Sequence, residues 1–245
     1  MTAVRLPCVR GHRGETVRAV QEWLCLNGYC VPIDDDFGPA TERAVELFQA
    51  AYGLENDKVV GQETYAALVA PMTEATRIVR SIEGGSPLGK VVTLYAQRHL
   101  DARAREVGGQ NKGPWVRLYM GGHEGSAWPW CAGFASYVLK QACKTVGTRL
   151  PLAPSYSCDM LAMEAREGGI LLAGRDASAE TVGVGDLFLV RRTSVDWTHV
   201  GVVLRSHTDY IETIEGNTND EGSREGYEVC RRFRSYGKKD FILIR

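Results

Sequence analysis

The stretch that decides the fold is Trp128–Leu139, with the sequence WPWCAGFASYVL. It predicts a short loop that turns into a helix at Cys131, because Pro129 is tolerated just before or within a first helical turn. Phe134 and Val138 are four residues apart, so the helix has an apolar face to bury. Cys131 therefore lies near a helix N-terminus, where unpaired N–H groups and the positive end of the helix dipole favour a thiolate.

Cys131 is a candidate nucleophile, although many cysteines in apolar helices are only small buried hydrophobes. Two later segments favour the catalytic interpretation. His199 stands at the start of a β-branched strand within Asp196–Leu204, and Glu215 and Asn217 follow in the next strand. Because strand side chains alternate, we expect Glu215 and Asn217 on the same face. A cysteine nucleophile needs a base and a group that orients the base, and this set supplies both.

The composition limits the class of protein. With 245 residues, 44% of them hydrophobic, the chain can form one large domain or two small ones. The net charge is −1 and no lysine- or arginine-rich run occurs, which argues against nucleic-acid binding. The longest apolar runs are too short to cross a bilayer, so we expect no membrane insertion. Met1–His12 lacks the apolar stretch of a secretory signal, which favours synthesis in the cytoplasm without a signal peptide.

The seven cysteines contain no C-x-x-C pair, and no histidine stands at zinc spacing to them, so we expect no structural zinc. Cys25 and Cys30 are close enough in sequence to form a disulfide. A protein made without a signal peptide usually keeps its thiols reduced, however, so we expect mostly free cysteines. The three aspartates at 34–36 are interpreted as a solvated turn, because the ligand spacing and terminal Glu of a calcium loop are missing. We expect no metal ion and no cofactor.

Residues 1–70 predict a small all-α domain of three helices. Helical periodicity covers Glu15–Leu26, a second helix begins near Pro39 and ends by Gly53, and a third covers Gln62–Val69. The turns before the second and third helices repeat each other, because Asp36-Phe37-Gly38-x-x-Thr41 is matched by Lys58-Val59-Val60-Gly61-x-x-Thr64.

A pattern of fixed spacings runs through this domain: Gly14-x-x-Val17-x-x-x-Gln21-x-x-Leu24-x-x-x-Gly28-Tyr29, Asp36-x-Gly38-x-x-Thr41-x-x-Ala44-Val45-x-x-Phe48-Gln49, Gly53-Leu54 and Val60-Gly61-x-x-Thr64-x-x-x-Leu68. It resembles the three-helix peptidoglycan-binding domain found beside many cell-wall hydrolases. The resemblance implies that the domain binds peptidoglycan. Most matched positions are core or turn residues, so the pattern does not identify the side chains that contact the ligand.

Proline and glycine punctuate residues 71–89, which we interpret as a linker with a short helical stretch near Thr76–Ile82. The second domain, residues 90–245, begins with helical periodicity over Val91–Glu106. After the Cys131 helix, Ser155 or Ser157 caps a further helix that runs to about Glu167. The segments that follow predict strands at Leu187–Arg191, His199–Ser206, Tyr210–Glu215, Glu228–Phe233 and Phe241–Ile244. Helices followed by strands predict an α+β class with an antiparallel sheet.

Five short motifs stand along the second domain: Asn111-x-Gly113-Pro114, Trp130-Cys131-Ala132-x-Phe134, Gly185-Asp186, His199-Val200-Gly201-Val202-Val203 and Ile214-Glu215-Gly216-Asn217. They resemble the CHAP family (cysteine- and histidine-dependent amidohydrolases/peptidases) of cell-wall hydrolases, within the papain-like group. The resemblance implies a papain-like α+β fold with Cys131 as nucleophile and His199 as base. Glu215 and Asn217 fall on the family's further polar positions. The calcium loop that some members carry ahead of the cysteine is missing here, so we expect no calcium.

The two resemblances imply a hydrolase that cuts an amide bond in peptidoglycan. The bond joins muramic acid to L-alanine (an amidase) or lies in the stem or cross-bridge peptide (an endopeptidase), and both remain open. The alternatives are a catalytically inactive peptidoglycan-binding or adaptor protein, and a transferase that passes the acyl group to an amine.

We expect a monomer that acts on the cell wall, in the periplasm or outside the cell. It reaches the wall either as a phage endolysin released by a holin or as a bacterial effector delivered into a rival. In the second case an immunity protein is a further partner. The histidines outside the strand context of His199, namely His12, His99, His123 and His207, are interpreted as surface or capping residues.

Overall fold

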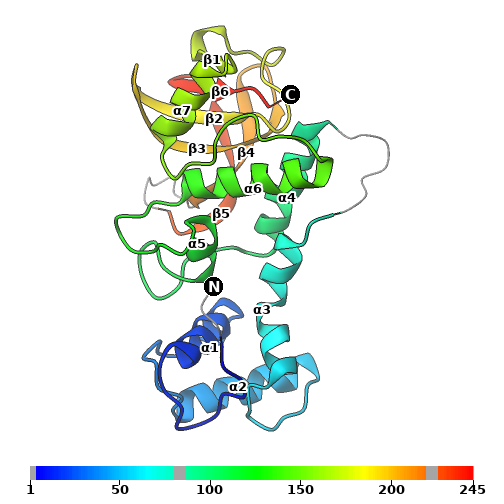
Figure 1. Ribbon diagram of the computed structural model, residues 1–245, viewed down its shortest axis with the longest axis vertical. Helices are drawn as coiled ribbons and strands as arrows, with labels where there is room; N and C mark the ends of the chain where they lie inside the picture. Colours follow the sequence, from blue (N-terminus) through cyan, green and yellow to red (C-terminus); the bar gives the residue numbers. More distant parts are fainter. Residues whose placement is uncertain (1–3, 80–86, 219–225, 245) are drawn as a thin grey trace.

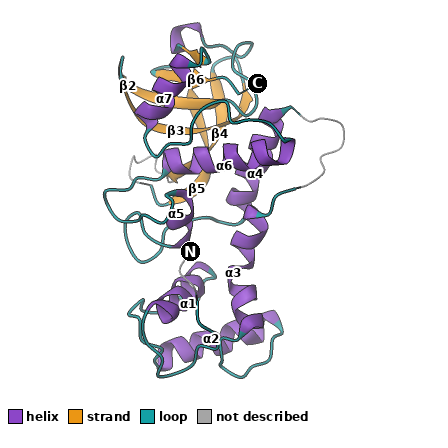
Figure 2. Cartoon of the chain, viewed as in Figure 1, coloured by secondary structure: helices purple, strands orange, loops and turns teal. Residues whose placement is uncertain are grey.

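The computed structural model describes residues 4–79, 87–218 and 226–244. Figure 1 shows a small helical unit at one end of an elongated molecule, and a sheet with its covering helices at the other end. Figure 2 shows the strands of the described residues gathered in this second part. The predicted α+β class with an antiparallel sheet is confirmed.

Three helices form the N-terminal unit, α1 (Glu15–Leu26), α2 (Pro39–Tyr52) and α3 (Gln62–Thr76). The first two begin and end where the sequence predicts. Pro39 occupies the first turn of α2, and Gly53 ends this helix in the left-handed conformation, with φ at +66°. The core of the unit contains Val17, Val20, Leu24, Val45, Phe48 and Leu68, all fully buried.

Two buried glutamines, Gln21 and Gln49, hold the two turns of this unit in the same way. Each side-chain amide donates to an aspartate carboxylate, a backbone carbonyl and a threonine hydroxyl, and each Oε1 atom accepts a backbone N–H from the same turn. In that order the acceptors are Asp34, Asp36 and Thr41 for Gln21, and Asp57, Val59 and Thr64 for Gln49. The predicted internal repeat is therefore confirmed, and both glutamines serve the structure of the unit.

The predicted end of the third helix at Val69 is wrong, because α3 continues through Pro71 to Thr76. The extra turns bury Met72 and Ala75, and the carbonyl of Ala75 accepts a hydrogen bond from Gln141 of the second part. This packing offsets the cost of a proline within a helix. The helix predicted near Thr76–Ile82 is not formed at residues 77–79, and its last three residues lie outside the described part.

Four helices open the second part, α4 (Leu88–Asp101), α5 (Pro114–Tyr119), α6 (Cys131–Val146) and α7 (Cys158–Glu167). The first of them ends at Asp101 rather than at the predicted Glu106. Arg103 has φ at +52°, a left-handed conformation that cannot continue a helix. The predicted cap of α7 is confirmed at Ser157, whose Oγ accepts the N–H of Met160.

Within the described residues, six strands form one sheet in the order β1-β6-β2-β3-β4-β5, and all neighbouring pairs are antiparallel. The bounds are β1 Leu171–Leu172, β2 Leu187–Thr193, β3 Asp196–Ser206, β4 Tyr210–Thr218, β5 Glu228–Ser235 and β6 Lys239–Ile242. All five predicted strands are present. Sequence reasoning misses β1, since two residues carry no periodicity.

The α6 helix packs on β3 and β4 and beside α4, and α7 packs on β3 (Figure 1). Phe134 and Val138 of α6 belong to the main buried core together with Val202 and Ile214 of the sheet. The apolar face predicted for the Cys131 helix is therefore buried. Its amino end is thereby placed against β3 and β4, the strands that carry His199 and Glu215.

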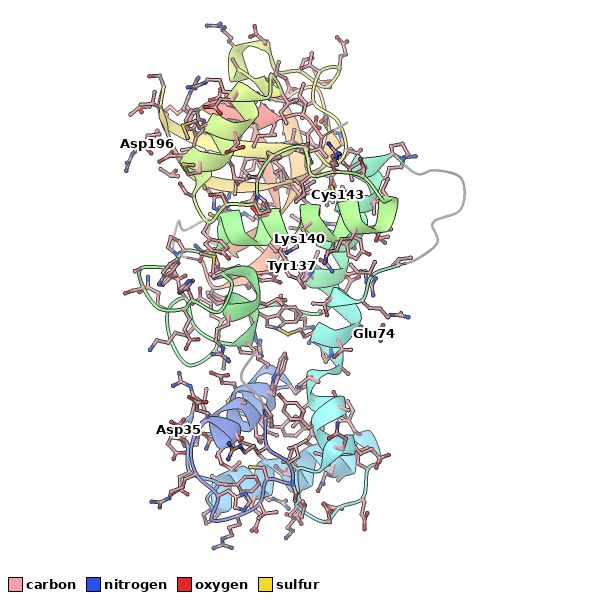
Figure 3. All side chains as sticks on the ribbon, in the orientation of Figure 1. Asp35, Glu74, Tyr137, Lys140, Cys143 and Asp196 are labelled. Atoms are coloured by element: carbon pink, nitrogen blue, oxygen red, sulfur yellow. The ribbon has the colours of Figure 1, made fainter. Side chains whose placement is uncertain are left out.

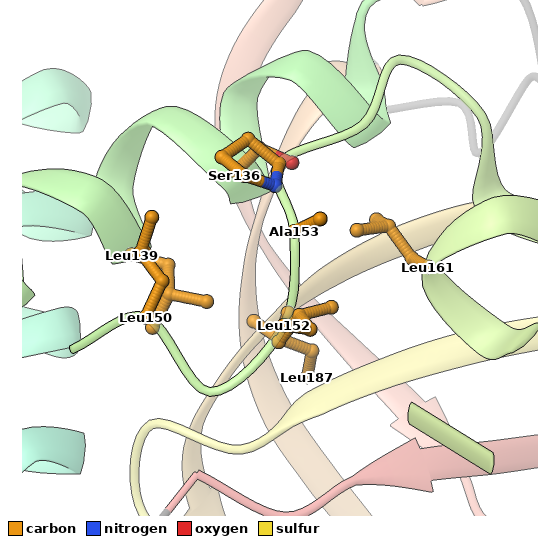
Figure 4. A pocket seen from close by; sticks show the side chains of 8 residues that line it. Ser136, Leu139, Leu150, Leu152, Ala153, Leu161 and Leu187 are labelled. Atoms are coloured by element: carbon orange, nitrogen blue, oxygen red, sulfur yellow. The ribbon is translucent and has the colours of Figure 1, made fainter. Parts of the chain in front are cut away.

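A small apolar pocket lies between α6, the segment 150–154, α7 and β2, and Figure 4 shows Leu139, Leu152 and Leu187 lining it. Ser136 of α6 fixes the chain beside this pocket. Its Oγ atom donates to the carbonyl of Ser155 (2.9 Å) and accepts the N–H of the same residue (3.1 Å). These bonds bring the start of α7 next to the start of α6.

Candidate active site

Cys131 is the first residue of α6, as the sequence predicts. It lines an open cleft of about 540 Å³, and only 5% of the residue is exposed. The cleft is built from segments far apart in the sequence. Its other lining residues include Trp128, Tyr156, Cys158, Trp197, Thr198 and Asn217.

His199 of β3 and Glu215 of β4 form a buried pair behind the cysteine. The Nε2 atom of His199 lies 2.8 Å from Oε2 of Glu215, which leaves the other ring nitrogen, Nδ1, to interact with Cys131. The two residues are 8% and 0% exposed. The structure therefore brings together the cysteine, the histidine and the carboxylate that the sequence singles out.

Two further side chains, which the sequence analysis missed, hold the Glu215 carboxylate. Arg234 of β5 donates through Nε to Oε1 (2.8 Å) and through Nη2 to Oε2 (2.6 Å). Thr213 donates through Oγ1 to Oε1 (2.6 Å). The alternation of β4 places Thr213 two residues before Glu215 and so could have identified it. Arg234 could not be found in this way, because it depends on the pairing of β4 with β5.

Electrostatic interactions favour a charged cysteine–histidine pair. Hydrogen bonds from Cys158 and His199 hold the pKa of the Cys131 thiol well below its ordinary value, against the opposing effect of burial. Burial lowers the pKa of His199, but hydrogen bonds to Cys131 and Glu215 outweigh it and raise this pKa to about 9. Burial likewise opposes ionisation of Glu215, yet Arg234 and His199 lower its pKa to about 2. The cysteine and carboxylate are thus anionic and the histidine cationic near neutral pH.

Asn217 departs from the predicted position on the same face as Glu215. The pairing of β4 with β5 is irregular between Glu215 and Thr218, and Asn217 has φ at +56°. The side chain therefore does not follow the alternation of a regular strand, and Asn217 lines the cleft beside Cys131. Its Oδ1 atom is buried and has no hydrogen-bond partner within the described residues, so a residue that lines the cleft carries an unpaired acceptor.

Two glycines permit the close packing of this site. A Cβ atom on Gly216 would lie 2.8 Å from Phe134 and Trp130 of the α6 region. A Cβ atom on Gly201 would lie 2.8 Å from Cγ of Glu215. Both distances are shorter than those at which Cβ atoms contact other atoms in proteins. Glycine is therefore required at position 216 for β4 to approach α6, and at position 201 for Glu215 to fit beside β3.

His99 contradicts its interpretation as a surface or capping residue. It is fully buried among aromatic rings, and its ring nitrogens lie 2.8 Å from Oε1 of Gln141 and 2.9 Å from the hydroxyl of Tyr119. Burial lowers the pKa of His99 to about 4, against the opposing hydrogen bond with Gln141. A neutral histidine thus belongs to the core between α4, α5 and α6.

None of the seven cysteines forms a disulfide in the structure, in which all of them are described. Within residues 4–79, 87–218 and 226–244, no group of three or more His, Cys, Asp or Glu side chains is arranged to hold a metal ion. None of the helices in this part of the chain is long and apolar enough to span a membrane.

Comparison with known proteins identifies the N-terminal unit. Residues 13–68 match the family described as "Putative peptidoglycan binding domain". A zinc D-Ala-D-Ala carboxypeptidase of Streptomyces albus G is 43% identical over 60 residues, which cover 22% of this chain and 23% of that protein. The chain thus spans about a quarter of the length of this curated relative. The N-terminal helices are a peptidoglycan-binding domain.

Two solved structures are also similar to this chain. The N-terminal domain of SleB shares 36% sequence identity, with 28% of this chain and 96% of that structure covered and a TM-score of 0.27. The endolysin of Burkholderia phage AP3 shares 28% identity, with 44% and 41% covered and a TM-score of 0.26. Both TM-scores are below 0.5, so neither likeness defines the fold of the whole molecule.

Proposed function

We propose that this protein is a cysteine-dependent peptidoglycan hydrolase of the CHAP type, which cleaves an amide bond. The observation that carries the proposal is the buried set of Cys131, His199 and Glu215 at one side of an open cleft. The peptidoglycan-binding domain on the same chain supplies the class of substrate.

In the proposed reaction the Cys131 thiolate attacks the carbonyl carbon of the scissile amide. The backbone N–H groups at the start of α6 have no partner within the helix and are suited to hold the oxyanion. The His199 imidazolium then gives its proton to the leaving amine, and water, activated by the neutral imidazole, releases the acyl group from the sulfur. Glu215 orients His199 and stabilises its charge. The free Oδ1 atom of Asn217 accepts an N–H of the substrate.

The scissile bond lies between muramic acid and L-alanine or within the stem or cross-bridge peptide. An inactive binding protein or adaptor, and an acyl transferase, remain the alternatives. A buried ionised pair in an open cleft favours catalysis over binding alone, because strongly shifted pKa values gather at reactive sites.

Purified sacculi test the proposal. The wild-type chain is expected to release soluble fragments with new amino groups, and mass spectrometry of the fragments identifies the bond. Cys131→Ala should abolish release and still sediment with sacculi. Cys143→Ala is the matched control, because this buried cysteine lies on the same helix, toward its other end (Figure 3).

Full activity of Cys131→Ala would exclude the cysteine mechanism. A wild-type chain that binds sacculi without releasing fragments would instead indicate the inactive binding protein. New cross-links in place of new amino groups would indicate the transferase.

A further inference from the structure

A second sulfur atom lies beside the candidate nucleophile. The Sγ atoms of Cys131 and Cys158 are 3.8 Å apart, although the residues are separated by 27 positions. Both residues line the same cleft, and they are 5% and 8% exposed. The two thiols are therefore close to each other and open to small reagents from the same side.

The fold holds this pair together. Each cysteine is the first residue of its helix, α6 or α7. Both hydrogen bonds between Ser136 and Ser155 tie the segment before α7 to α6. The N–H of Trp197 donates to Oδ1 of Asp159 (2.6 Å), which fixes the first turn of α7 to β3. The distance between the two sulfur atoms is thus set by α6, α7 and β3, which these hydrogen bonds hold together.

Disulfide bonding requires a sulfur–sulfur distance of about 2.05 Å, so the two sulfurs must approach by roughly 1.8 Å. Rotation of the two side chains, with a small movement of the helix ends, can cover such a distance. No other cysteine on α6 competes, since Cys143 lies about 18 Å further along this helix at 1.5 Å per residue.

We propose that Cys131 and Cys158 are a peroxide-reactive dithiol site, in which Cys158 captures oxidised Cys131 as a disulfide. The proposal rests on the proposed function only for its effect on hydrolysis, because the new bond can be observed without any activity measurement.

The reaction proceeds in two balanced steps. The Cys131 thiolate attacks one oxygen of a hydroperoxide, the O–O bond breaks, and the sulfur becomes a sulfenic acid while the leaving oxygen takes a proton and departs as water or an alcohol. The Cys158 sulfur then attacks the sulfenic sulfur, the S–O bond breaks, and the S–H proton leaves with the hydroxyl as water. The two thiols lose two electrons, which reduce the peroxide, and a dithiol reductant reverses the change.

The disulfide blocks the nucleophile and also protects it. A sulfenic acid without a partner thiol is oxidised further to sulfinic acid, which dithiols do not reduce. Capture by Cys158 diverts Cys131 from that irreversible product. The site would hold the hydrolase inactive in an oxidising medium and release it on reduction.

Peptide mapping of the full chain tests this inference. Trypsin cleavage after Lys and Arg places Cys131 in fragment 118–140 and Cys158 in fragment 150–166, each with one cysteine. Hydrogen peroxide at neutral pH, followed by alkylation and digestion without reductant, should yield these two fragments joined, lighter by two hydrogen atoms than their sum. Dithiothreitol should restore both thiols. The rate of sacculus hydrolysis should fall more than about tenfold when the disulfide forms and should recover when it is reduced.

Cys158→Ser is the decisive variant, and Cys143→Ser its matched control. In the Cys158 variant we expect Cys131 to gain two oxygen atoms as sulfinic acid and to resist dithiothreitol, whereas the Cys143 variant should behave as wild type. Sulfinic acid at Cys131 in the wild type, at the same rate as in the Cys158 variant, would overturn the proposal. A disulfide to any other cysteine would overturn it as well. A joined pair in a chain that never hydrolyses sacculi would contradict only the proposed function.

Discussion

At the scale of single residues, Glu215 helps to set the pH up to which His199 stays protonated. The carboxylate accepts from His199 at one oxygen and from Arg234 at both, and it is fully buried. A buried carboxylate that is fully hydrogen-bonded stays ionised and stabilises a neighbouring imidazolium. Glu215 therefore acts as an orienting and charge-stabilising residue in the proposed mechanism.

The first residue-scale prediction concerns the pH profile of Glu215→Gln. The pKa of His199 is raised to about 9, so the imidazolium is present below this pH and the wild-type rate should fall as the pH rises through it. Without the carboxylate this pKa drops, and the alkaline limb should move to lower pH. The rate should also fall about 10- to 100-fold, because a hydrogen bond to a charged group contributes about 1.5–3 kcal/mol.

Asn217→Ala separates the two polar residues. An amide does not titrate, so this variant should lose rate without a shift of the alkaline limb, measured as kcat/KM against pH on solubilised peptidoglycan. If Glu215→Gln keeps both the wild-type rate and the wild-type pH of the alkaline limb, while Asn217→Ala loses most of its activity, the two roles are reversed.

At the scale of elements, the approach of β4 to α6 positions the site. Gly216 lies against Phe134 and Trp130, and it stands between Glu215 and Asn217 in the strand. A side chain at this point would push β4 away from α6. The two polar residues would then shift relative to Cys131.

Gly216→Ala should therefore lower the free energy of unfolding by about 1–3 kcal/mol, the usual cost of an overpacked core, and should also lower the rate on sacculi. Gly237→Ala is the control, since the nearest atom to a Cβ there is 3.8 Å away. Chemical denaturation and sacculus turnover measure both effects. Wild-type stability and rate in the Gly216 variant would show that the close packing is not needed.

At the scale of the whole molecule, the binding domain is docked on the second part by a buried ion pair. Arg117 of α5 donates through Nη2 to Oε2 of Glu22 on α1 (2.5 Å) and through Nη1 to Glu124 (2.7 Å). The Glu22 side chain is 1% exposed and that of Arg117 is 25% exposed, so the carboxylate is withdrawn from water and the guanidinium only partly. The N-terminal unit therefore contacts the second part directly through α1 and α5. The predicted domain boundaries and the linker at 71–89 stay predictions.

Loss of this contact is predicted to destabilise the molecule. Arg117→Ala leaves Glu22 buried with only Arg18 at 3.4 Å, and removal of one partner of a buried pair costs about 3 kcal/mol. Arg43→Ala breaks the exposed pair with Glu46 and should cost less than about 1 kcal/mol. Urea denaturation of both variants makes the comparison. Equal small costs would mean that the interface contributes little to stability.

Local rules account for the elements that sequence reasoning located correctly. Helical periodicity, Pro39 in a first turn, the Ser157 cap and the alternation in β3 depend on neighbours within a few residues. The same rules placed Cys131 at a helix start and His199 on a strand. They were insufficient at α3, where burial of Met72 and Ala75 carries the helix beyond its predicted end.

By itself, then, the sequence determined the class of fold, the repeated helix starts of the N-terminal unit and the positions of Cys131 and His199 on their elements, because periodicity, capping and fixed spacing are local properties of the chain. Peptidoglycan binding and the roles of the candidate residues came from the resemblance to known families. Only the tertiary structure decided which side chains meet. The irregularity in β4 turns Asn217 into the cleft, the packing of α7 brings Cys158 to Cys131, and the pairing with β5 delivers Arg234 to Glu215. These contacts join residues distant in sequence, and their geometry comes from strand register and close packing, which no single segment encodes.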